Sequence, residues 1–557
     1  MFRTRSNVWE KVGPLSLIAG LSLWLIFLLS TRVTYSEIGL IDTVGVLFYV
    51  SVGLITLAII VQILTGKIGF LCYLSVISLF AAMYSLPWLI EGTPYFSAIF
   101  RVLGYTNFIV DHNFYNPAAM SYQNWPGVML VGMFIKSAFN CQAIDILYIY
   151  PIVAKVLQLA VVYLIIERMT KDRAGAIVGV TLFILFDWTP YYMFLPPSMG
   201  FLLFVAVMLV LCVRHVDTTR RGGWIMLFIL FVASCIISHL LTAILILGIL
   251  LALYLLENSP IKLFRVSSKG TITFGLLVLS TVMMFSYTLY ANTKYFQLAL
   301  PGFINSIGNL IRVFGSASNV GSGSSAYSEV VLYKYVFTAI IGIVLLVAFI
   351  YILRKSKGMR QFHNFFPFLV MFISVVIPVT IFSFYNFEAI TRSFAYVIPF
   401  VALFLVYSRK RRAVAILIVV LMLISPALFV ASAYGNMNKD FISRDEIIGT
   451  TFYYDHTDQQ KSFAYGFNER LLLMDMINEW RYRNIEILDG VGNWENNSYP
   501  SYVVFSDRAI EAGLYFGVNA DINTTYNILY GNHGARVYDS PTYRLFWTGP
   551  WNTTVVT

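Results

Sequence analysis

The chain has 557 residues, of which 58% are apolar, 16% aromatic and only 12% charged, and its mean hydropathy is +0.74. Soluble domains carry about 25% charged residues, so this chain has too few charges to cover the surface of a soluble globule. Its apolar residues come in long uncharged runs, which excludes disorder, collagen-like repeats and coiled coils. The composition therefore predicts a polytopic membrane protein.

Cysteine spacing and short motifs exclude further classes. The four cysteines have no paired spacing, so neither a disulfide framework nor a zinc site is expected. The sequence has no GxGxxG, GxxxxGKS/T or HExxH motif, which argues against a nucleotide-driven machine and a zinc protease. No nucleic-acid module is visible either. The net charge of +10 comes mostly from basic residues that fall on one side of the predicted membrane crossings.

The apolar runs predict the membrane crossings. About 20 apolar residues span the hydrocarbon core as a helix. On that criterion we expect about thirteen crossings, at 14–30, 43–64, 68–90, 144–166, 174–188, 198–213, 223–238, 240–256, 270–291, 330–353, 365–384, 393–408 and 413–433.

The positions of Lys and Arg predict the orientation of these crossings. If the N-terminus is cytoplasmic, most Lys and Arg residues fall in cytoplasmic loops, such as the basic loop 409–412. An odd number of crossings then places the C-terminal segment on the outer side, where the N-x-S/T tripeptides at Asn496, Asn523 and Asn552 agree with it. We therefore expect a multi-pass protein of the cell membrane.

Two domains follow from this topology. Residues 1–433 are expected to form a mainly α transmembrane helical bundle, and residues 434–557 a small extracytoplasmic α+β domain. In the second domain the pattern predicts a helix near 469–482, a strand at 501–505, and a hairpin whose strands, 536–538 and 543–546, flank the turn Asp539-Ser540-Pro541-Thr542.

Two external segments differ from simple loops. Residues 91–143 contain apolar residues at helical spacing over 95–110, which predicts a helix lying in the membrane interface, and a second such helix is expected to begin at Pro126. Residues 292–329 include a Gly/Ser-rich stretch that is flexible by composition, as either a lid or a plain linker.

Charged residues at the outer boundary are the first candidates for chemistry, because charge near a membrane is costly unless it is used or paired. Glu91 directly follows the third apolar run. Apolar neighbours shield it in part, which suits either a general base for a hydroxyl acceptor or a plain interfacial anchor. Asp111 and His112 lie further along the same segment, as candidate metal ligands or as solvated loop residues.

A histidine marks the next candidate. The apolar run 223–256 has about 34 residues, roughly 50 Å of helix, which is enough for two short crossings rather than one. Ser238, His239 and Thr242 are expected at the outer tip of this hairpin. His239 either takes part in chemistry or only solvates the bend.

The later candidates are a cation and an aromatic loop. Glu388 and Arg392 are spaced i, i+4, and Arg392 either pairs with Glu388 or holds a lipid phosphate in a bidentate fork. An aromatic, proline-broken loop at 191–198 follows Asp187 and Trp188, and its rings suit a sugar face, a polyprenyl chain or an ordinary interfacial belt. Lys155, in the middle of the fourth run, must face an interior groove or a partner.

The order of these motifs resembles the GT-C superfamily of polyprenyl-phosphate-sugar-dependent membrane glycosyltransferases, and more closely a group of archaeal multi-pass proteins with this plan. The residues that carry the resemblance are Glu91-Gly92-Thr93-Pro94-Tyr95-Phe96, Trp125-Pro126-Gly127, Asp187-Trp188, 192–200, Ser238-His239 with Thr242, Arg392-Ser393-Phe394-Ala395 and Val537-Tyr538-Asp539.

The resemblance implies transfer of a sugar from a polyprenyl-phosphate-linked donor to a glycan, lipid or protein acceptor on the outer face, by an inverting displacement. Glu91 would be the base, His239 would orient or protonate, and Arg392 and Arg101 would hold the donor phosphate. No cofactor is required, with a divalent metal as an option. The expected substrate-binding residues are Tyr95, Trp125, Asp187, Tyr192, Ser198, Thr242 and Glu388.

Two other classes remain open. A transporter or flippase of lipid-linked glycans would use the intramembrane Lys155 and Lys334 as switches, and internal repeat symmetry would favour it. A non-catalytic membrane scaffold would only display the outer domain.

Overall fold

The computed structural model describes residues 7–31, 40–94, 96, 98–113, 124–216, 221–259, 273–291, 325–354, 362–381, 387–409, 411–435, 442–456, 463–465, 487–488, 502–506, 535–539 and 543–547. For Glu91, His112, Glu388 and Arg392 it describes the backbone alone.

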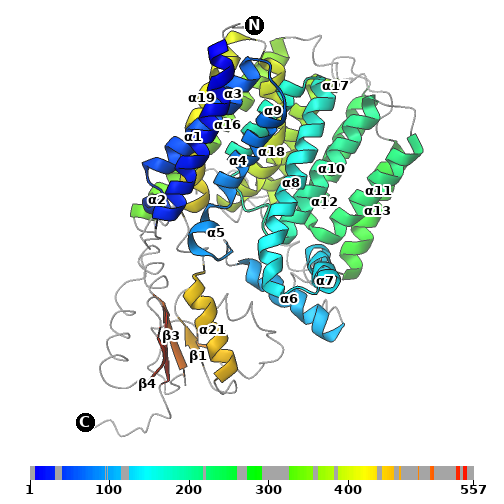
Figure 1. The fold of residues 1–557 in the computed structure, drawn as a ribbon. Coiled ribbons are helices and arrows are strands. Elements are labelled where there is room, and N and C mark those ends of the chain that lie inside the picture. Colours follow the sequence, from blue (N-terminus) through cyan, green and yellow to red (C-terminus); the bar gives the residue numbers. More distant parts are fainter. Residues whose placement is uncertain are drawn as a thin grey trace.

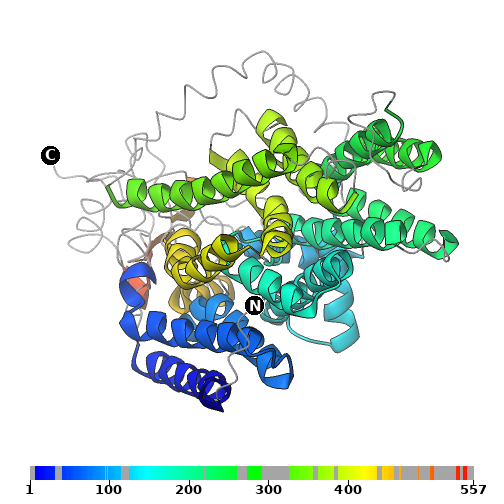
Figure 2. The same cartoon turned by 90° about the horizontal axis from the view of Figure 1, so that it is seen from above.

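The N-terminal helices form one edge of a helical bundle (Figures 1 and 2). Helices α1 and α3 pack closely along each other. Gly20 of α1 permits this approach, because a Cβ at that position would lie 2.8 Å from Ile55 Cγ1 and 2.9 Å from Ser51 O of α3. These elements are α1 (Asn7–Ser30), α2 (Leu40–Thr43), α3 (Val46–Leu64), α4 (Phe70–Tyr84) and α5 (Leu86–Glu91).

The centre of the bundle is built around α9. All residues from 175 to 186 of this helix are buried, as expected of a helix that is apolar on every side, and it packs on α4, α8, α18 and α19. The helices of this middle part of the chain are α8 (Ala143–Thr170), α9 (Arg173–Phe186), α10 (Pro196–Val216), α11 (Arg221–Ser238), α12 (Leu240–Glu257) and α13 (Phe274–Ala291).

The last helices of the bundle pack back onto this centre. Helix α17 contacts α12 and α18, and α19 contacts α3, α9 and α16. They are α16 (Ser325–Arg354), α17 (Phe362–Ile381), α18 (Phe387–Ser408) and α19 (Arg412–Tyr434).

Two short helices lie at one end of the bundle, α6 (Ala98–His112) and α7 (Gly127–Phe139). Figure 1 shows them at the lower end, opposite the start of α1. Both were expected from the external segment, and α7 begins directly after Pro126, as predicted. Gly127 contacts the hairpin of α11 and α12, because a Cβ there would overlap the side chain of Ser238. The histidine-bearing bend is therefore at the same end of the bundle as α7.

The C-terminal part contains α21 (Arg444–His456) and five short strands, β1 (Phe463–Tyr465), β2 (Ile487–Leu488), β3 (Tyr502–Ser506), β4 (Ala535–Asp539) and β5 (Tyr543–Trp547). They form one sheet in the order β2-β1-β3-β5-β4. The expected hairpin is present, because β4 and β5 pair antiparallel. Figure 1 shows α21 and the sheet below α5, at the end of the bundle that carries α6. The helix expected at 469–482 and the three N-x-S/T tripeptides lie outside the described residues, and the domain boundary at 433/434 stays a prediction.

The described helices include seven that are long and apolar enough to cross a membrane: Trp9–Ser30, Val46–Leu64, Ala143–Thr170, Pro196–Arg214, Leu240–Glu257, Phe274–Ala291 and Arg412–Tyr434. The other expected crossings coincide with shorter apolar helices, Phe70–Tyr84, Arg173–Phe186, Gly222–Ser238, Phe365–Pro378 and Ser393–Ser408, and with α16. The helical segments are thus confirmed, while the number of crossings stays a prediction.

Two predicted boundaries were wrong. The run 68–90 was expected as one helix, but it breaks at Ser85 into α4 and α5. Pro87 explains the break, because proline has no backbone N–H to continue the hydrogen bonding of α4, whereas it is tolerated in the first turn of a new helix. The external loop expected at 292–329 ends earlier, since α16 begins at Ser325; residues 292–324 lie outside the described part.

We predict that Gly20→Ala destabilises the protein by about 1–3 kcal/mol, because the added methyl group forces α1 away from α3. Gly53→Ala is the control, since it lies in α3 with nothing within 4 Å of an added Cβ and removes a flexible residue from a helix. Thermal unfolding in detergent micelles measures both. Equal melting temperatures for the two variants would contradict the proposed contact.

Candidate functional site

An apolar cavity of about 280 Å³ lies beside the break between α4 and α5. Its wall is dominated by aromatic and aliphatic side chains, which suits an apolar or ring-shaped ligand rather than a free ion. The lining residues come from α1, α4, α5, α8 and the segment after α9: Trp24, Phe80, Ala81, Tyr84, Ser85, Pro87, Trp88, Leu89, Pro94, Leu147, Tyr148, Pro151, Ile152, Tyr192 and Met193.

Glu91 belongs to the segment that walls this cavity. It is the last residue of α5, between the lining residues Leu89 and Pro94. The chain turns sharply after it, because Gly92 has a left-handed φ of 72°, which glycine adopts without steric strain. Tyr148 Oη fixes this turn by donating a hydrogen bond to Gly92 O at 2.9 Å. The backbone at Glu91 thus adjoins the cavity, while the next predicted residue, Tyr95, lies outside the described part of the chain.

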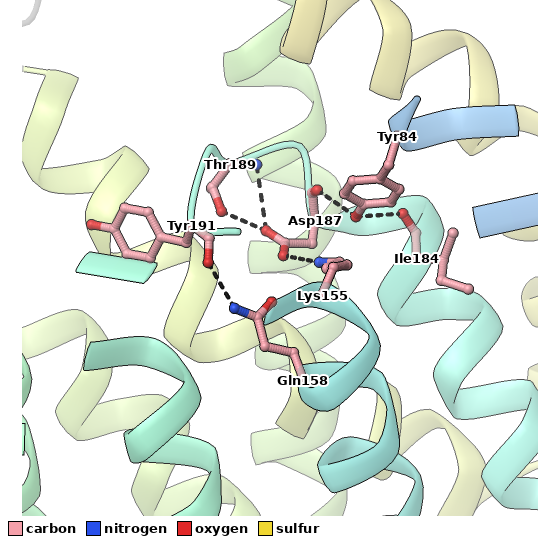
Figure 3. A network of polar contacts seen from close by, with 7 residues as sticks. All are labelled: Tyr84, Lys155, Gln158, Ile184, Asp187, Thr189 and Tyr191. Carbon is pink, nitrogen blue, oxygen red and sulfur yellow. Dashed lines mark hydrogen bonds and ion pairs between the residues drawn. The ribbon is translucent and has the colours of Figure 1, made fainter. Parts of the chain in front are cut away.

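A buried ion pair lies next to the cavity wall (Figure 3). Lys155 Nζ of α8 and Asp187 Oδ2, at the C-terminal end of α9, are 2.5 Å apart, and both side chains have an exposed fraction of 0%. The other carboxylate oxygen, Oδ1, accepts a hydrogen bond from Thr189 Oγ1 at 2.5 Å. Aromatic rings surround the ammonium group, with Phe183 at 4.2 Å and Tyr84 at 4.6 Å from Nζ. Lys155 therefore has the interior partner that its position required.

The aromatic segment after Asp187 is held to α8 a second time. Gln158 Nε2 donates to Tyr191 O at 2.7 Å, one helical turn from Lys155 (Figure 3). Tyr192 follows at once and packs its ring against Tyr84 with centroids 4.8 Å apart. Tyr192 and Met193 then line the cavity. Tyr192, which was predicted to bind substrate, thus lies in the cavity wall; its role stays a prediction.

The predicted residues His239 and Thr242 meet in a hydrogen-bonded cluster. His239 caps α12, and its Nδ1 is 2.8 Å from Thr242 Oγ1. Thr242 Oγ1 is in turn 2.5 Å from Tyr396 Oη of α18. We call His239, Thr242 and Tyr396 the histidine cluster. Because Thr242 stands between a ring nitrogen and a phenol, it restricts the orientation of both rings.

The N-terminal part of α10 packs against this cluster. A Cβ at Gly200 would lie 2.7 Å from both His239 Cβ and Thr242 Oγ1, so only glycine fits there without a shift. Ser198, two residues earlier, is buried, with its Oγ 3.3 Å from Tyr150 Oη. Ser198 therefore contributes to the packing between α8 and α10 near the cluster.

The predicted phosphate-binding residues lie on two helices. Arg392 and Glu388 are in the first turns of α18, so their i, i+4 spacing is helical as assumed, and Arg392 precedes Tyr396 by about one turn. Arg101 is half-buried in α6. Trp125 is buried just before α7, next to Asn124, whose carbonyl accepts a hydrogen bond from Tyr287 Oη at 2.8 Å.

The candidate metal ligands lie at the end of α6. The Asp111 side chain is exposed, and in the part of the chain that the structure describes no group of three or more His, Cys, Asp or Glu residues gathers to hold a metal ion. The side chain of His112 lies outside the described part of the chain, so the metal site stays a prediction.

The structure brings some predicted residues together and leaves others apart. His239 and Thr242 share a cluster, whereas the described lining of the cavity includes Tyr192 and neither of them. The segment 187–200 connects the two, since Tyr192 walls the cavity, Gly200 packs on His239, and the ring of Tyr191 lies 5.8 Å from that of Tyr396. Tyr396 was not among the predicted residues, although it lies one residue beyond the motif Arg392-Ser393-Phe394-Ala395.

We predict that Thr242→Val destabilises the protein by about 1–3 kcal/mol, because His239 Nδ1 and Tyr396 Oη each lose a hydrogen-bonding partner. Thr242→Ser keeps the hydroxyl and is the matched control. Unfolding of the two variants in the same detergent tests this, and equal stability would show that the hydroxyl is dispensable.

Comparison with known proteins gives matches among solved structures. No protein-family model matches the chain, and no curated protein matches it. The oligosaccharyltransferase of Archaeoglobus fulgidus, solved with a tethered acceptor peptide, is 13% identical with a TM-score of 0.45, over 87% of this chain and 75% of that one. ArnT from Cupriavidus metallidurans in the apo state is 13% identical with a TM-score of 0.45, over 85% of this chain and 98% of that one.

A second structure of ArnT, bound to undecaprenyl phosphate, is 9% identical with a TM-score of 0.38, over 85% of this chain and 97% of that one. These proteins are GT-C glycosyltransferases, the superfamily that the order of motifs resembles. At TM-scores below 0.5 the similarity assigns neither a fold nor an activity to this chain.

Proposed function

We propose that the protein is an integral membrane glycosyltransferase that moves a sugar from a polyprenyl-phosphate-linked donor to an acceptor at the outer face of the membrane. The observation that carries the proposal is the segment 187–200. Tyr192 of this segment lines an aromatic cavity whose wall also includes residues of α5, the helix that carries Glu91. Gly200, at the end of the segment, packs against the histidine cluster. A carboxylate can act as the general base of such a transfer, a histidine can orient or protonate a substrate group, and an apolar cavity can hold a ring or an isoprenoid chain.

In the proposed reaction Glu91 is the general base. Its carboxylate takes the proton of the acceptor hydroxyl while the hydroxyl oxygen attacks the anomeric carbon of the sugar. The bond between that carbon and the phosphate oxygen breaks, and polyprenyl phosphate leaves with the bonding electrons. Attack opposite to the leaving group inverts the anomeric centre.

The charge of the leaving phosphate is the second requirement. A guanidinium group matches phosphate oxygens in a bidentate fork, and we assign this role to Arg392 and Arg101. Arg392 lies about one turn before Tyr396, which belongs to the histidine cluster. His239 would orient the substrate or donate a proton to it. This assignment is supported by Tyr396, through which α18 contacts the rest of the histidine cluster.

The remaining predicted contacts follow from the cavity. Tyr192 lines it, and the aromatic rings around it suit the face of a sugar or the start of an isoprenoid chain. We keep Tyr95, Trp125, Ser198, Thr242 and Glu388 as proposed substrate-binding residues, and Asp111 and His112 as the proposed ligands if a divalent metal takes part. Asp187 was predicted with them, but both of its carboxylate oxygens are engaged by protein groups, Lys155 and Thr189.

The orientation in the membrane is also proposed. Helices α6 and α7 and the C-terminal α21 lie at the same end of the bundle, opposite the start of α1 (Figure 1). This arrangement supports a cytoplasmic N-terminus, with the site and residues 434–557 on the outer face. The acceptor is then a glycan, lipid or protein on that face.

The transporter alternative relied on Lys155 and Lys334 as intramembrane switches. Lys155 is paired with Asp187, and Lys334 Nζ lies 5.5 Å from the ring centroid of Trp188. Both lysines thus contact the two residues that begin the aromatic segment, which supports a role in holding that segment.

We predict that Glu91→Gln lowers the rate of sugar transfer by about 10²–10⁴-fold, because the amide cannot accept the proton of the acceptor hydroxyl. The assay supplies purified protein with polyprenyl-phosphate sugars and an acceptor. Glu10→Gln is the control, since Glu10 is an exposed residue of α1 whose carboxylate pairs with Lys67, just after α3. Unchanged transfer by Glu91→Gln would remove Glu91 as the base, and movement of donor between leaflets without any transfer would favour the transporter.

We predict that Arg392→Lys raises KM for the donor by about tenfold, because lysine keeps the charge but loses the bidentate fork. Arg168→Lys is the matched control, because Arg168 lies in the last turn of α8, outside the proposed site, with 59% of its side chain exposed. Initial rates at increasing donor concentration give KM for both variants. Equal KM values would show that Arg392 does not bind the phosphate.

A further inference from the structure

The aromatic segment 187–195 has an unusual environment for irregular backbone. It begins where α9 ends, and Asp187, Trp188, Thr189 and residues 191–195 are all buried. Within a membrane protein, non-helical backbone is tolerated only where its polar groups are satisfied by protein or water. The contacts that satisfy these groups therefore decide where the segment lies.

Helix α8 supplies one contact to the backbone of the segment and, on the same face, an ion pair to the side chain of Asp187 (Figure 3). Lys155 Nζ holds the Asp187 carboxylate at 2.5 Å, and Gln158 Nε2 holds Tyr191 O at 2.7 Å. From α4, Tyr84 Oη is 2.8 Å from Asp187 O and 3.1 Å from Ile184 O, and donates to these carbonyls. The ion pair is the only one of these contacts that joins two charges.

An ion pair is well suited to restrict the position of this segment. A buried ion pair adds little net stability, because the desolvation of both ions offsets their attraction, but loss of one partner leaves an uncompensated charge. The pair therefore tolerates little movement of Asp187 relative to α8. A hydrogen bond between neutral groups would tolerate more.

Both halves of the site depend on this segment. Tyr192 and Met193 form part of the cavity wall. On the other side the segment contacts α18. The Tyr191 ring lies 5.8 Å from the ring of Tyr396, and the Trp188 ring lies 5.4 Å from the ring of Phe394. A shift of residues 187–191 would thus change the distance between the cavity and the histidine cluster.

We propose that Lys155 and Asp187 are positioning residues: their ion pair fixes segment 187–195 so that the cavity wall and the histidine cluster keep the relative position that transfer requires. Asp187 then acts through Tyr191, Tyr192 and Met193, and it does not touch the substrate. The effect on catalysis rests on the proposed function, whereas the effect on the position of the segment does not.

The test uses the charge-neutral double variant Lys155→Met with Asp187→Asn in the full-length protein, because either single variant leaves a buried charge unpaired and is expected to fold poorly. Removal of both charges should change the melting temperature by less than about 2 °C. Thr170→Val is the matched control, since it removes a hydroxyl contact at the far end of α8.

The first measurement needs no activity. A reporter cysteine, Met193→Cys, is placed in a Cys141→Ser background, because Cys72, Cys212 and Cys235 are buried. Met193 is 5% exposed, so N-ethylmaleimide should label the reporter slowly, and at least about tenfold faster in the double variant if the segment is released. An unchanged labelling rate would overturn the proposal, whether or not the protein transfers sugar.

The second measurement is the transfer assay. We expect kcat of the double variant to fall by about 10–100-fold, the size of loss that a misplaced site produces, with a smaller change in KM for the donor and none in Thr170→Val. Wild-type kcat and KM in a stable double variant would overturn the positioning role. Absence of transfer in the wild type contradicts the proposed function alone, since the labelling rate still decides the position of the segment.

Discussion

The central part of the fold depends on one constraint, the burial of the Lys155 ammonium group. This side chain lies in the middle of α8 and is fully buried, where an unpaired charge is strongly unfavourable. The chain meets the constraint by ending α9 at Asp187, so that a carboxylate faces the ammonium group. Aromatic rings at 4.2 to 5.8 Å from Nζ surround the pair and add their negative faces.

The end of α9 at this point has consequences for its neighbours. A helix of 14 residues is about 21 Å long, which is shorter than the roughly 30 Å of a hydrocarbon core. The chain therefore continues as irregular backbone inside the bundle, and Tyr84 and Gln158 satisfy its carbonyl groups. Aromatic side chains of that irregular segment reach both the cavity and α18.

The sequence predicted the features that depend on neighbouring residues. Long apolar runs located the helices, Pro126 located the start of α7, and the length of the run 223–256 predicted the bend at His239 between α11 and α12. Features that depend on distant residues were missed, because no local pattern records them. Lys155 and Asp187 are 32 residues apart and meet only after α8 and α9 pack, and Thr242 and Tyr396 are 154 apart. The break at Ser85 was missed for another reason, since hydropathy does not register Pro87.

The histidine cluster lies where the N-terminal parts of two helices meet. Gly200, the fifth residue of α10, approaches His239 and Thr242 at the start of α12, and a Cβ at Gly200 would lie 2.7 Å from both His239 Cβ and Thr242 Oγ1. The His239 ring is therefore restricted twice, by its hydrogen bond to Thr242 and by the backbone of α10. Because only glycine at position 200 allows this approach without a shift, the orientation of the histidine depends on packing between α10 and α12 as well as on its hydrogen bond.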